Sequence, residues 1–184
     1  MAKLYFKYGV MGCSKSAQAL ITKFNYEERG MKVLLIKPAI DTRDGKDVVK
    51  SRIGLSSEAY AVSADENLYD FYVKKHKDND VIIVDECQFL TTEQVDQLGD
   101  IVIDFNVPVL CFGLACDFTN HLFEGSKRLF EIAESVAEIK SVCRCGAKAT
   151  VTARFDDEGH ILYKGEQVVL GGNNRYTAMC RKCW

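Results

Sequence analysis

The amino-acid sequence predicts an α/β fold, in which an open parallel sheet is flanked by helices and followed by a small metal-binding lobe. Apolar runs typical of strands alternate with helix-like patterns along most of the chain. A glycine-containing loop joins the first strand to the first helix, and an acidic pair follows a later strand. Two pairs of cysteines lie near the C-terminal end. We therefore expect two domains, at residues 1–140 and 141–184.

The composition is that of a globular protein with a substantial core. Hydrophobic residues make up 47% of the 184 residues, and charged residues make up 27%. The net charge of −2 argues against a nucleic-acid surface built on bulk positive charge. We recognise no secretory signal and no apolar run near about 18 residues. We therefore expect no membrane span, and a cytoplasmic protein with reduced cysteines.

The predicted sheet begins at the N-terminal end of the chain. A strand over residues 3–8 leads to a helix over residues 16–29, which Gly30 ends. A second strand over residues 31–37 stops at Pro38. The buried face of the helix is expected to contain Ala17, Leu20, Ile21 and Phe24.

The middle of the chain, residues 38–57, is polar and rich in charge, and we expect it to form a long loop on the side of the binding site. Capping-box sequences at residues 63–66 and 91–94 predict two helix starts. The elements expected after the loop are, in order, a helix at 63–77, a strand at 80–85, a helix at 91–105, a strand at 107–112, a helix at 126–134 and a strand at 136–139.

The loop after the first strand has the pattern of a phosphate-binding loop. Its sequence is Gly9-Val10-Met11-Gly12-Cys13-Ser14-Lys15-Ser16. In such a loop, backbone N–H groups point at phosphate, a lysine adds charge at the β- and γ-phosphates, and the next hydroxyl binds Mg²⁺. Lys15 and Ser16 fit these roles. Ser14 stands where the usual pattern has glycine, so the loop taken alone fits an ordinary strand–helix turn equally well.

An acidic pair, Asp85 and Glu86, follows the apolar run Val81–Val84. Consecutive β-branched residues indicate a strand that is buried on both faces of a parallel sheet. Ligands of such sheets bind beyond the carboxyl ends of the strands. One carboxylate there can support Mg²⁺, and its neighbour can accept a proton from an attacking hydroxyl. The alternative is a solvated turn, but the pair and the loop together favour a nucleoside-triphosphate site.

The C-terminal segment contains four cysteines in two pairs: Cys143 and Cys145, then Cys180 and Cys183. Reduced thiols in two pairs suit tetrahedral Zn²⁺. The second pair has the spacing of a zinc ribbon, and the first is one residue shorter. The alternative is four reduced thiols that pack a small hairpin lobe.

Taken together, these residues resemble the type II thymidine kinases over nearly the whole chain. The resemblance implies a RecA-like P-loop domain and a zinc-ribbon-like lasso domain, which assemble as a dimer or tetramer. The matching motifs are Tyr8-Gly9-x-Met11 with Lys15-Ser16, Asp41-Thr42-Arg43, Asp85-Glu86-Cys87-Gln88-Phe89, Gly113-Leu114 with Asp117-Phe118, Phe123-Glu124-Gly125-Ser126, Cys145-Gly146 with Ala149, Thr152 and Arg154, and Gly171-Gly172-Asn173 with Tyr176 before Cys180-Arg181-x-Cys183.

The resemblance implies a kinase that transfers the γ-phosphoryl group of ATP to the 5′-hydroxyl of thymidine, and also of deoxyuridine. Lys15 would bind the β- and γ-phosphates, and Ser16 and Asp85 would bind Mg²⁺. Glu86 would take the proton of the 5′-hydroxyl. Arg43 would stabilise charge on the transferred group. The residues expected near the ATP phosphates are Gly9, Val10, Met11, Gly12, Cys13, Ser14, Lys15, Ser16, Asp41, Arg43 and Asp85.

The resemblance also implies a lasso, residues 146–176, that closes over the nucleoside and reads the base largely through backbone groups. It further implies feedback inhibition by dTTP and no nucleic-acid or membrane partner. The residues expected to bind the nucleoside are Met11, Gln88, Phe89, Leu114, Phe118, Thr152, Val169, Leu170 and Tyr176.

Two alternatives come from other classes of protein. Asp85-Glu86-Cys87-Gln88 also resembles a helicase box, but a motor needs paired domains and a basic face, which this chain lacks. A nucleotide-binding sensor that has lost catalysis through its altered phosphate loop is the second alternative. We favour the kinase, because Lys15, Arg43 and Glu86 are all present.

Overall fold

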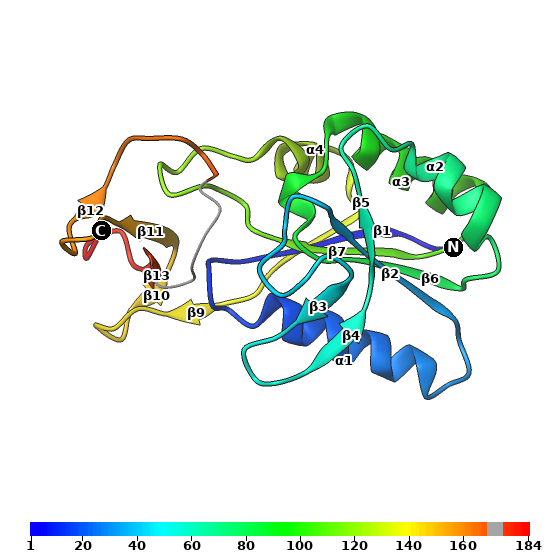
Figure 1. Ribbon diagram of the computed structural model, residues 1–184, viewed down its shortest axis with the longest axis horizontal. Coiled ribbons are helices and arrows are strands. Elements are labelled where there is room, and N and C mark those ends of the chain that lie inside the picture. The colour runs from blue at the N-terminus through cyan, green and yellow to red at the C-terminus, as the bar shows by residue number, and fades with distance from the viewer. Residues whose placement is uncertain (169–174) are drawn as a thin grey trace.

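The computed structural model describes residues 1–168 and 175–184. Its centre is a six-stranded sheet in the order β5-β2-β6-β7-β1-β8, in which all neighbours pair in parallel (Figure 1). The predicted open parallel sheet is confirmed. Its strands are β1 (Leu4–Tyr8), β2 (Val33–Pro38), β5 (Tyr60–Val62), β6 (Val81–Val84), β7 (Val109–Gly113) and β8 (Ser135–Glu138).

Helices cover both faces of this sheet. One helix, α1, lies on one face, and α2, α3 and α4 lie on the other (Figure 1). Alternate residues of each strand therefore enter different cores. Ile82 packs with Leu98 of α3, whereas Ile83 packs with Leu20 of α1. The helices are α1 (Lys15–Glu27), α2 (Leu68–Phe71), which continues as a π-helix (Tyr72–His76), α3 (Thr92–Phe105) and α4 (Glu124–Ile132), and a 3₁₀ turn spans Cys87–Phe89.

The expected loop at residues 38–57 contains a β-hairpin, which the sequence analysis missed. Its strands are β3 (Val48–Lys50) and β4 (Ser56–Glu58), paired antiparallel. Val49 is buried and packs in the same core as α1. The prediction of a long, mobile loop was therefore wrong for its second half, because contacts with α1 hold the hairpin in place.

The face of α1 that packs against the rest of the protein is narrower than predicted. Ala17 and Leu20 are buried as expected, but Ile21 and Phe24 are 46% and 58% exposed. Instead, Ala19 joins the buried set. The helix approaches the sheet and the hairpin through its small residues, so the larger side chains on its flank remain at the surface.

One of the two predicted helix starts is confirmed. At α3, Thr91 and Gln94 form the expected reciprocal capping box. The start predicted at residues 63–66 was wrong, since α2 begins at Leu68 and the Asn67 side chain accepts the N–H of Asp70 at 2.8 Å. The Gln94 amide donates to the carbonyl oxygens of residues 63 and 66, and this contact holds that segment as a turn.

The C-terminal residues form small antiparallel sheets beyond the carboxyl ends of the parallel strands (Figure 1). One sheet pairs β9 (Ser141–Val142) with β10 (Lys148–Ala149). The other has the order β12-β11-β13, with strands Ile161–Leu162, Val151–Phe155 and Tyr176–Met179. In the part of the chain that the structure describes, no helix has the length and apolar character needed to cross a membrane.

The capping box of α3 yields the first prediction. The Thr91→Ala substitution removes the hydroxyl that accepts the N–H of Gln94, so the free energy of unfolding should fall by about 1 kcal/mol. Urea denaturation measures this value. Thr92→Ala, one residue inside the helix, is the matched control and should lower the free energy of unfolding much less. Equal losses in the two variants would contradict the capping role.

Candidate active site

The loop between β1 and α1 is fixed to the sheet and leads directly into a helix N-terminus. The Gly9 N–H donates to the Gly113 carbonyl oxygen of β7 at 3.2 Å, and the Cys13 N–H donates to that of Val10 at 3.3 Å. A Cβ on Gly9 would lie 2.4 Å from the Cys13 sulfur, so only glycine fits there. Gly12 has a φ of +77°, which also favours glycine. This geometry suits the binding of an anion by backbone N–H groups.

Ser14 closes this loop in the left-handed backbone region, with φ 67° and ψ 21°. Its hydroxyl donates to the Cys13 carbonyl oxygen and does not cap α1. A residue other than glycine in this region costs about 1–3 kcal/mol. The serine therefore strains the loop, but the turn that leads into α1 still forms.

Lys15 is 7% exposed and folds back over its own loop. Its ammonium donates to the Val10 carbonyl oxygen at 2.9 Å and lies 3.7 Å from the Cys13 sulfur. A carbonyl oxygen and a thiol are weak partners for an ammonium group that is almost entirely buried. The ammonium can therefore exchange them for phosphate oxygens without losing an ion pair.

Asp85 ends β6 as a nearly buried carboxylate whose Oδ1 has no hydrogen-bond partner among the described residues. Burial raises its pKa to about 7 and the charge of Glu86 adds to this, while the Ser16 hydroxyl and the Lys15 charge favour ionisation. A buried, unpaired carboxylate oxygen beside a hydroxyl is a donor set that suits a hard cation such as Mg²⁺. The residues present therefore fit that ion.

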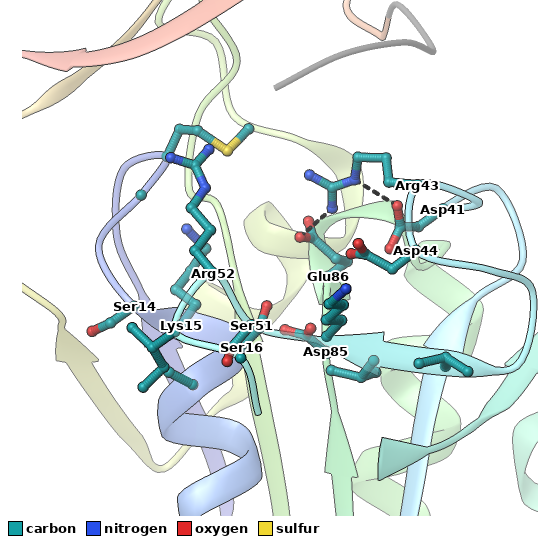
Figure 2. Close-up of a pocket in the computed structure, with 18 residues that line it drawn as sticks. Ser14, Lys15, Ser16, Asp41, Arg43, Asp44, Ser51, Arg52, Asp85 and Glu86 are labelled. Carbon is teal, nitrogen blue, oxygen red and sulfur yellow. Dashed lines mark hydrogen bonds and ion pairs between the residues drawn. The ribbon is translucent and has the colours of Figure 1, made fainter. Parts of the chain in front are cut away.

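Glu86 is held in a fixed position by side chains from both directions. Its backbone is left-handed, with φ 52°, and its side chain points into the pocket (Figure 2). One carboxylate oxygen accepts from Arg43 Nη2 and the other from Gln88 Nε2, each at 2.5 Å. The side-chain amide oxygen of Gln88, Oε1, in turn accepts the Leu114 N–H at 3.0 Å. The carboxylate is thus connected to the loop after β2 and to the end of β7.

Arg43 bridges Glu86 to a second buried carboxylate, that of Asp41. Arg43 Nε donates to Asp41 at 2.6 Å (Figure 2). Burial opposes ionisation of Asp41, but the hydrogen bonds and charge of Arg43, together with the charge of Lys37, hold its pKa below the ordinary value. Burial also opposes the charge on Arg43, yet Glu86 and Asp41 raise its pKa. Asp41 and Arg43 are therefore both charged near neutral pH.

Lys37 supports this arrangement from within the sheet, and sequence analysis missed it. The residue is 1% exposed, and its ammonium lies 3.5 Å from Asp41. It also donates to the carbonyl oxygens of Gly45 and Val48, each at 2.9 Å. One lysine thus holds the loop that carries Arg43. The available signal was a lysine at the end of an apolar strand.

These groups converge on an open pocket of about 330 Å³, shown in Figure 2. Residues 9–16, Asp41, Arg43, Asp85 and Glu86 were predicted to meet there, and most of them line it. The β3–β4 hairpin supplies most of the rest of the wall; its segment was expected on the side of the binding site, but as a loop and not as a hairpin. The lining residues that were not predicted are Ala17, Asp44, Val48, Val49, Lys50, Ser51, Arg52, Ile53 and Gly54.

The residues expected to bind the nucleoside lie beyond this pocket, and only Met11 also lines it among the described ones. The Met11 N–H donates to the Thr152 hydroxyl at 3.0 Å, which joins the phosphate loop to β11. Phe118 and Leu114 are buried, and the ring of Phe89 packs edge-on against another aromatic ring. Tyr176 is half-buried at the start of β13. Val169 and Leu170 lie outside the described residues.

Residues 165–167, within the expected lasso, contact Arg154 of the lasso's own strand β11 and Asp117 of the body of the protein. The Arg154 guanidinium lies 3.7 Å from the centre of the Phe118 ring and donates to the Glu166 carbonyl oxygen at 2.8 Å. The Gln167 amide donates to Asp117 at 2.9 Å. Sequence analysis assigned no role to Asp117 or Arg154, because their partners lie far away in the chain.

The four predicted cysteines come together in the C-terminal lobe. Their sulfur atoms all lie within 4.8 Å of one another, and those of Cys145 and Cys180 are 3.6 Å apart. Tetrahedral zinc with bonds of about 2.3 Å separates sulfurs by about 3.8 Å, so the cluster is compatible with Zn²⁺. Backbone N–H groups of Cys145 and Cys180 lower the pKa of Cys143 to about 6, whereas hydrogen bonds with the other thiols raise that of Cys183 to about 12. If a cation binds here, the four sulfurs can all act as thiolate ligands.

Comparison with known proteins gives consistent matches over the whole chain. The family model described as thymidine kinase matches residues 2–184. A thymidine kinase of Enterobacteria phage T4 is 48% identical over 100% of this chain and 96% of its own length. A thymidine kinase of Zymomonas mobilis is 49% identical, over 99% of this chain and 95% of its own. A solved Pif1 helicase from Candida albicans covers 78% of this chain and 37% of its own at 15% identity, with a TM-score of 0.42, too low to support an inference.

The buried lysine gives a prediction about the loop that carries Arg43. Lys37→Met should leave the Gly45 and Val48 carbonyl oxygens without a donor and lower the free energy of unfolding by about 1–3 kcal/mol. Amide hydrogen exchange over residues 41–48 should accelerate. Lys32→Met, which breaks an exposed pair with Asp78, is the control and should change little. Unchanged exchange in Lys37→Met would show that the lysine does not hold the loop.

Proposed function

This chain belongs to the thymidine kinase family, and we propose that it phosphorylates thymidine with the γ-phosphoryl group of ATP at the 5′-hydroxyl. Deoxyuridine is the second substrate that we expect. One observation carries the proposal: a phosphate loop with its lysine and the carboxylate of Glu86, fixed by two hydrogen bonds, lie in the same pocket. The choice of donor and the roles given below are our proposals.

The phosphate loop would bind the donor. Its backbone N–H groups and the N-terminus of α1 would surround the β-phosphate, and Lys15 would contact the β- and γ-phosphates. Ser16 and Asp85 would hold Mg²⁺, whose charge, when the ion is bound, offsets that of the phosphates. The residues of the loop need no large movement for this, since the turn is already formed.

Glu86 would act as the general base that takes the proton of the 5′-hydroxyl. It is ready for this role because hydrogen bonds from Arg43 and Gln88 hold its carboxylate in place. Arg43 can then move its second N–H group toward the transferred phosphoryl group, where negative charge is concentrated. Asp41, the other partner of Arg43, keeps the guanidinium near the pocket in both arrangements.

The nucleoside would bind between the end of the sheet and the lasso. We propose that residues 1–140 form the nucleotide-binding domain and residues 141–184 the lasso domain, with zinc at the four cysteines. The contacts of Arg154 and Gln167 support a lasso that is attached to the body of the protein near Phe118. The residues that we propose for the nucleoside site are Met11, Gln88, Phe89, Leu114, Phe118, Thr152, Val169, Leu170 and Tyr176.

Several properties of this proposal follow from the family resemblance alone. They are a dimeric or tetrameric assembly and inhibition by dTTP. A cytoplasmic location is supported by the thiol cluster, which needs reducing conditions. Because the backbone of Ser14 is strained, we expect weaker ATP binding than a glycine at this position would give. A catalytically weak nucleotide-binding sensor is therefore the second candidate function.

The central test is turnover of ATP and thymidine by the protein and by Glu86→Gln. Removing a general base should lower kcat by about 10²–10⁴-fold and leave the Kd for thymidine within about threefold. Glu28→Gln, an exposed glutamate on the far end of α1, is the control and should have full activity. Full activity in Glu86→Gln would exclude Glu86 as the base. Bound thymidine without turnover in the unsubstituted protein would favour the sensor.

The thiol cluster predicts a structural zinc ion. The purified protein should contain about one zinc per chain by elemental analysis, since four thiolates complete a structural site. Cys180→Ser should lose the metal and lower the melting temperature, and Cys116→Ser, outside the cluster, should do neither. Full stability of the metal-free protein would support the alternative in which reduced thiols only pack the lobe.

A further inference from the structure

Arg52 extends over the phosphate loop from a different element, the turn of the β3–β4 hairpin. Its Nη1 atom lies 3.4 Å from the position that a Cβ on Gly12 would occupy. Figure 2 shows its side chain above Lys15 and Ser16, across the pocket from Arg43. Arg52 is thus a cation on the open side of the loop to which we assign phosphate binding.

The turn that carries Arg52 is closed by its own hydrogen bonds. The Ser51 N–H donates to the Leu55 carbonyl oxygen at 2.8 Å, and the Leu55 N–H donates to the Ser51 hydroxyl at 3.0 Å. The Gly54 N–H donates to the Ser51 carbonyl oxygen at 3.1 Å, with Gly54 at a φ of +90°. Ser51 itself is only 5% exposed. These hydrogen bonds fix the conformation of the turn that carries Arg52.

The hairpin is also anchored to the helix that begins at the phosphate loop. Val49 is 3% exposed and belongs to the same core as Ala19 and Leu20 of α1. The backbone of the turn therefore keeps its place relative to the loop. The Arg52 side chain can reach a phosphate without a change in the fold.

Unlike Arg43, the other arginine that we discuss in this pocket, Arg52 has no carboxylate partner among the described residues. Arg43 is paired with Asp41 and Glu86. Arg52 makes no hydrogen bond or ion pair with any residue in 1–168 or 175–184. A guanidinium presents its N–H groups in a planar arrangement that matches two phosphate oxygens. An unpaired one beside an anion site is suited to a negatively charged ligand.

We propose that Arg52 binds the β- and γ-phosphate oxygens of the nucleoside triphosphate, on the side opposite the backbone of the phosphate loop. This inference rests on the proposed function, since it takes ATP as the donor. Lys15 then contacts the triphosphate from within the loop and Arg52 from the hairpin. The residue contributes to donor affinity and distinguishes a triphosphate from a nucleoside, while Glu86 and Arg43 remain available for the acceptor side.

The test is equilibrium binding of ATP with Mg²⁺, and separately of adenosine and thymidine, to the full chain. Arg52→Ala should weaken ATP binding by about tenfold or more, the order expected for charge-assisted hydrogen bonds, and leave the Kd for adenosine and thymidine within about twofold. The ATP affinity of Arg52→Lys should lie between that of the unsubstituted protein and that of Arg52→Ala, because a point charge replaces the planar group. Leu55→Ala, on the same turn but outside the pocket wall, keeps the charge of the turn and should bind ATP like the unsubstituted protein.

Steady-state kinetics give the second readout. In Arg52→Ala the KM for ATP should rise while the KM for thymidine stays unchanged, and the affinity for ATP should depend less on salt. Equal ATP affinity in Arg52→Ala and the unsubstituted protein would overturn the inference. An equal loss of ATP affinity in Leu55→Ala would also overturn it, since the turn and not the charge would then matter.

Direct binding separates this inference from the proposed function. If the protein binds ATP but transfers no phosphoryl group to thymidine, the proposed reaction fails, and Arg52 is still judged by the ratio of ATP affinities. If the unsubstituted protein does not bind ATP, both are wrong.

Discussion

The ion pair between Arg43 and Glu86 connects the loop after β2 to the end of β6, and the charged groups of the pocket are arranged around it. On one side, Arg43 continues to Asp41 and then to Lys37 inside the sheet. On the other side, Glu86 continues through Gln88 to the backbone of β7. Adjacent parallel strands end at the same edge of the sheet, and this edge is where the chain of contacts runs.

Such a row of buried charges is costly for folding. Each charge loses hydration, and the attraction between partners repays this loss only when every group is paired. Here Asp41, Arg43 and Glu86 are paired, whereas one oxygen of Asp85 is not. Asp85 and Lys15, which are buried without an ion-pair partner among the described residues, and the exposed guanidinium of Arg52 all face the space where a magnesium nucleotide would lie. The distribution of unsatisfied charge is therefore better explained by ligand binding than by stability.

Much of the site followed from the sequence because its parts are local patterns. The phosphate loop, the acidic pair and the spacing of the cysteines each occupy a few consecutive residues, and the rule that parallel strands end together places the first two side by side. What the sequence could not reveal depends on contacts across the fold. The hairpin at residues 48–58 stays in place because Val49 packs beside α1.

Two further errors have the same origin. No helix begins at the capping-box sequence of residues 63–66, because the Gln94 side chain, some thirty residues away, donates hydrogen bonds to carbonyl oxygens of that segment. The exposed positions of Ile21 and Phe24 depend on which elements lie beside α1. Residues such as Lys37 and Arg52 have no recognisable motif, and their importance appears only when their surroundings are known.

The carboxylate of Glu86 is held between Arg43 and Gln88, and we expect its activity as a base to depend on these two contacts. A double-mutant cycle in kcat between Gln88→Met and Glu86→Gln tests this dependence most directly, with thymidine affinity measured for all four proteins. At saturating thymidine, Gln88 is expected to affect kcat through Glu86, so the double variant should be no slower than Glu86→Gln alone, whereas its proposed contact with the nucleoside should appear in the Kd for thymidine. Losses that multiply across the two substitutions would contradict the account, because they would mean that Gln88 contributes independently of the carboxylate.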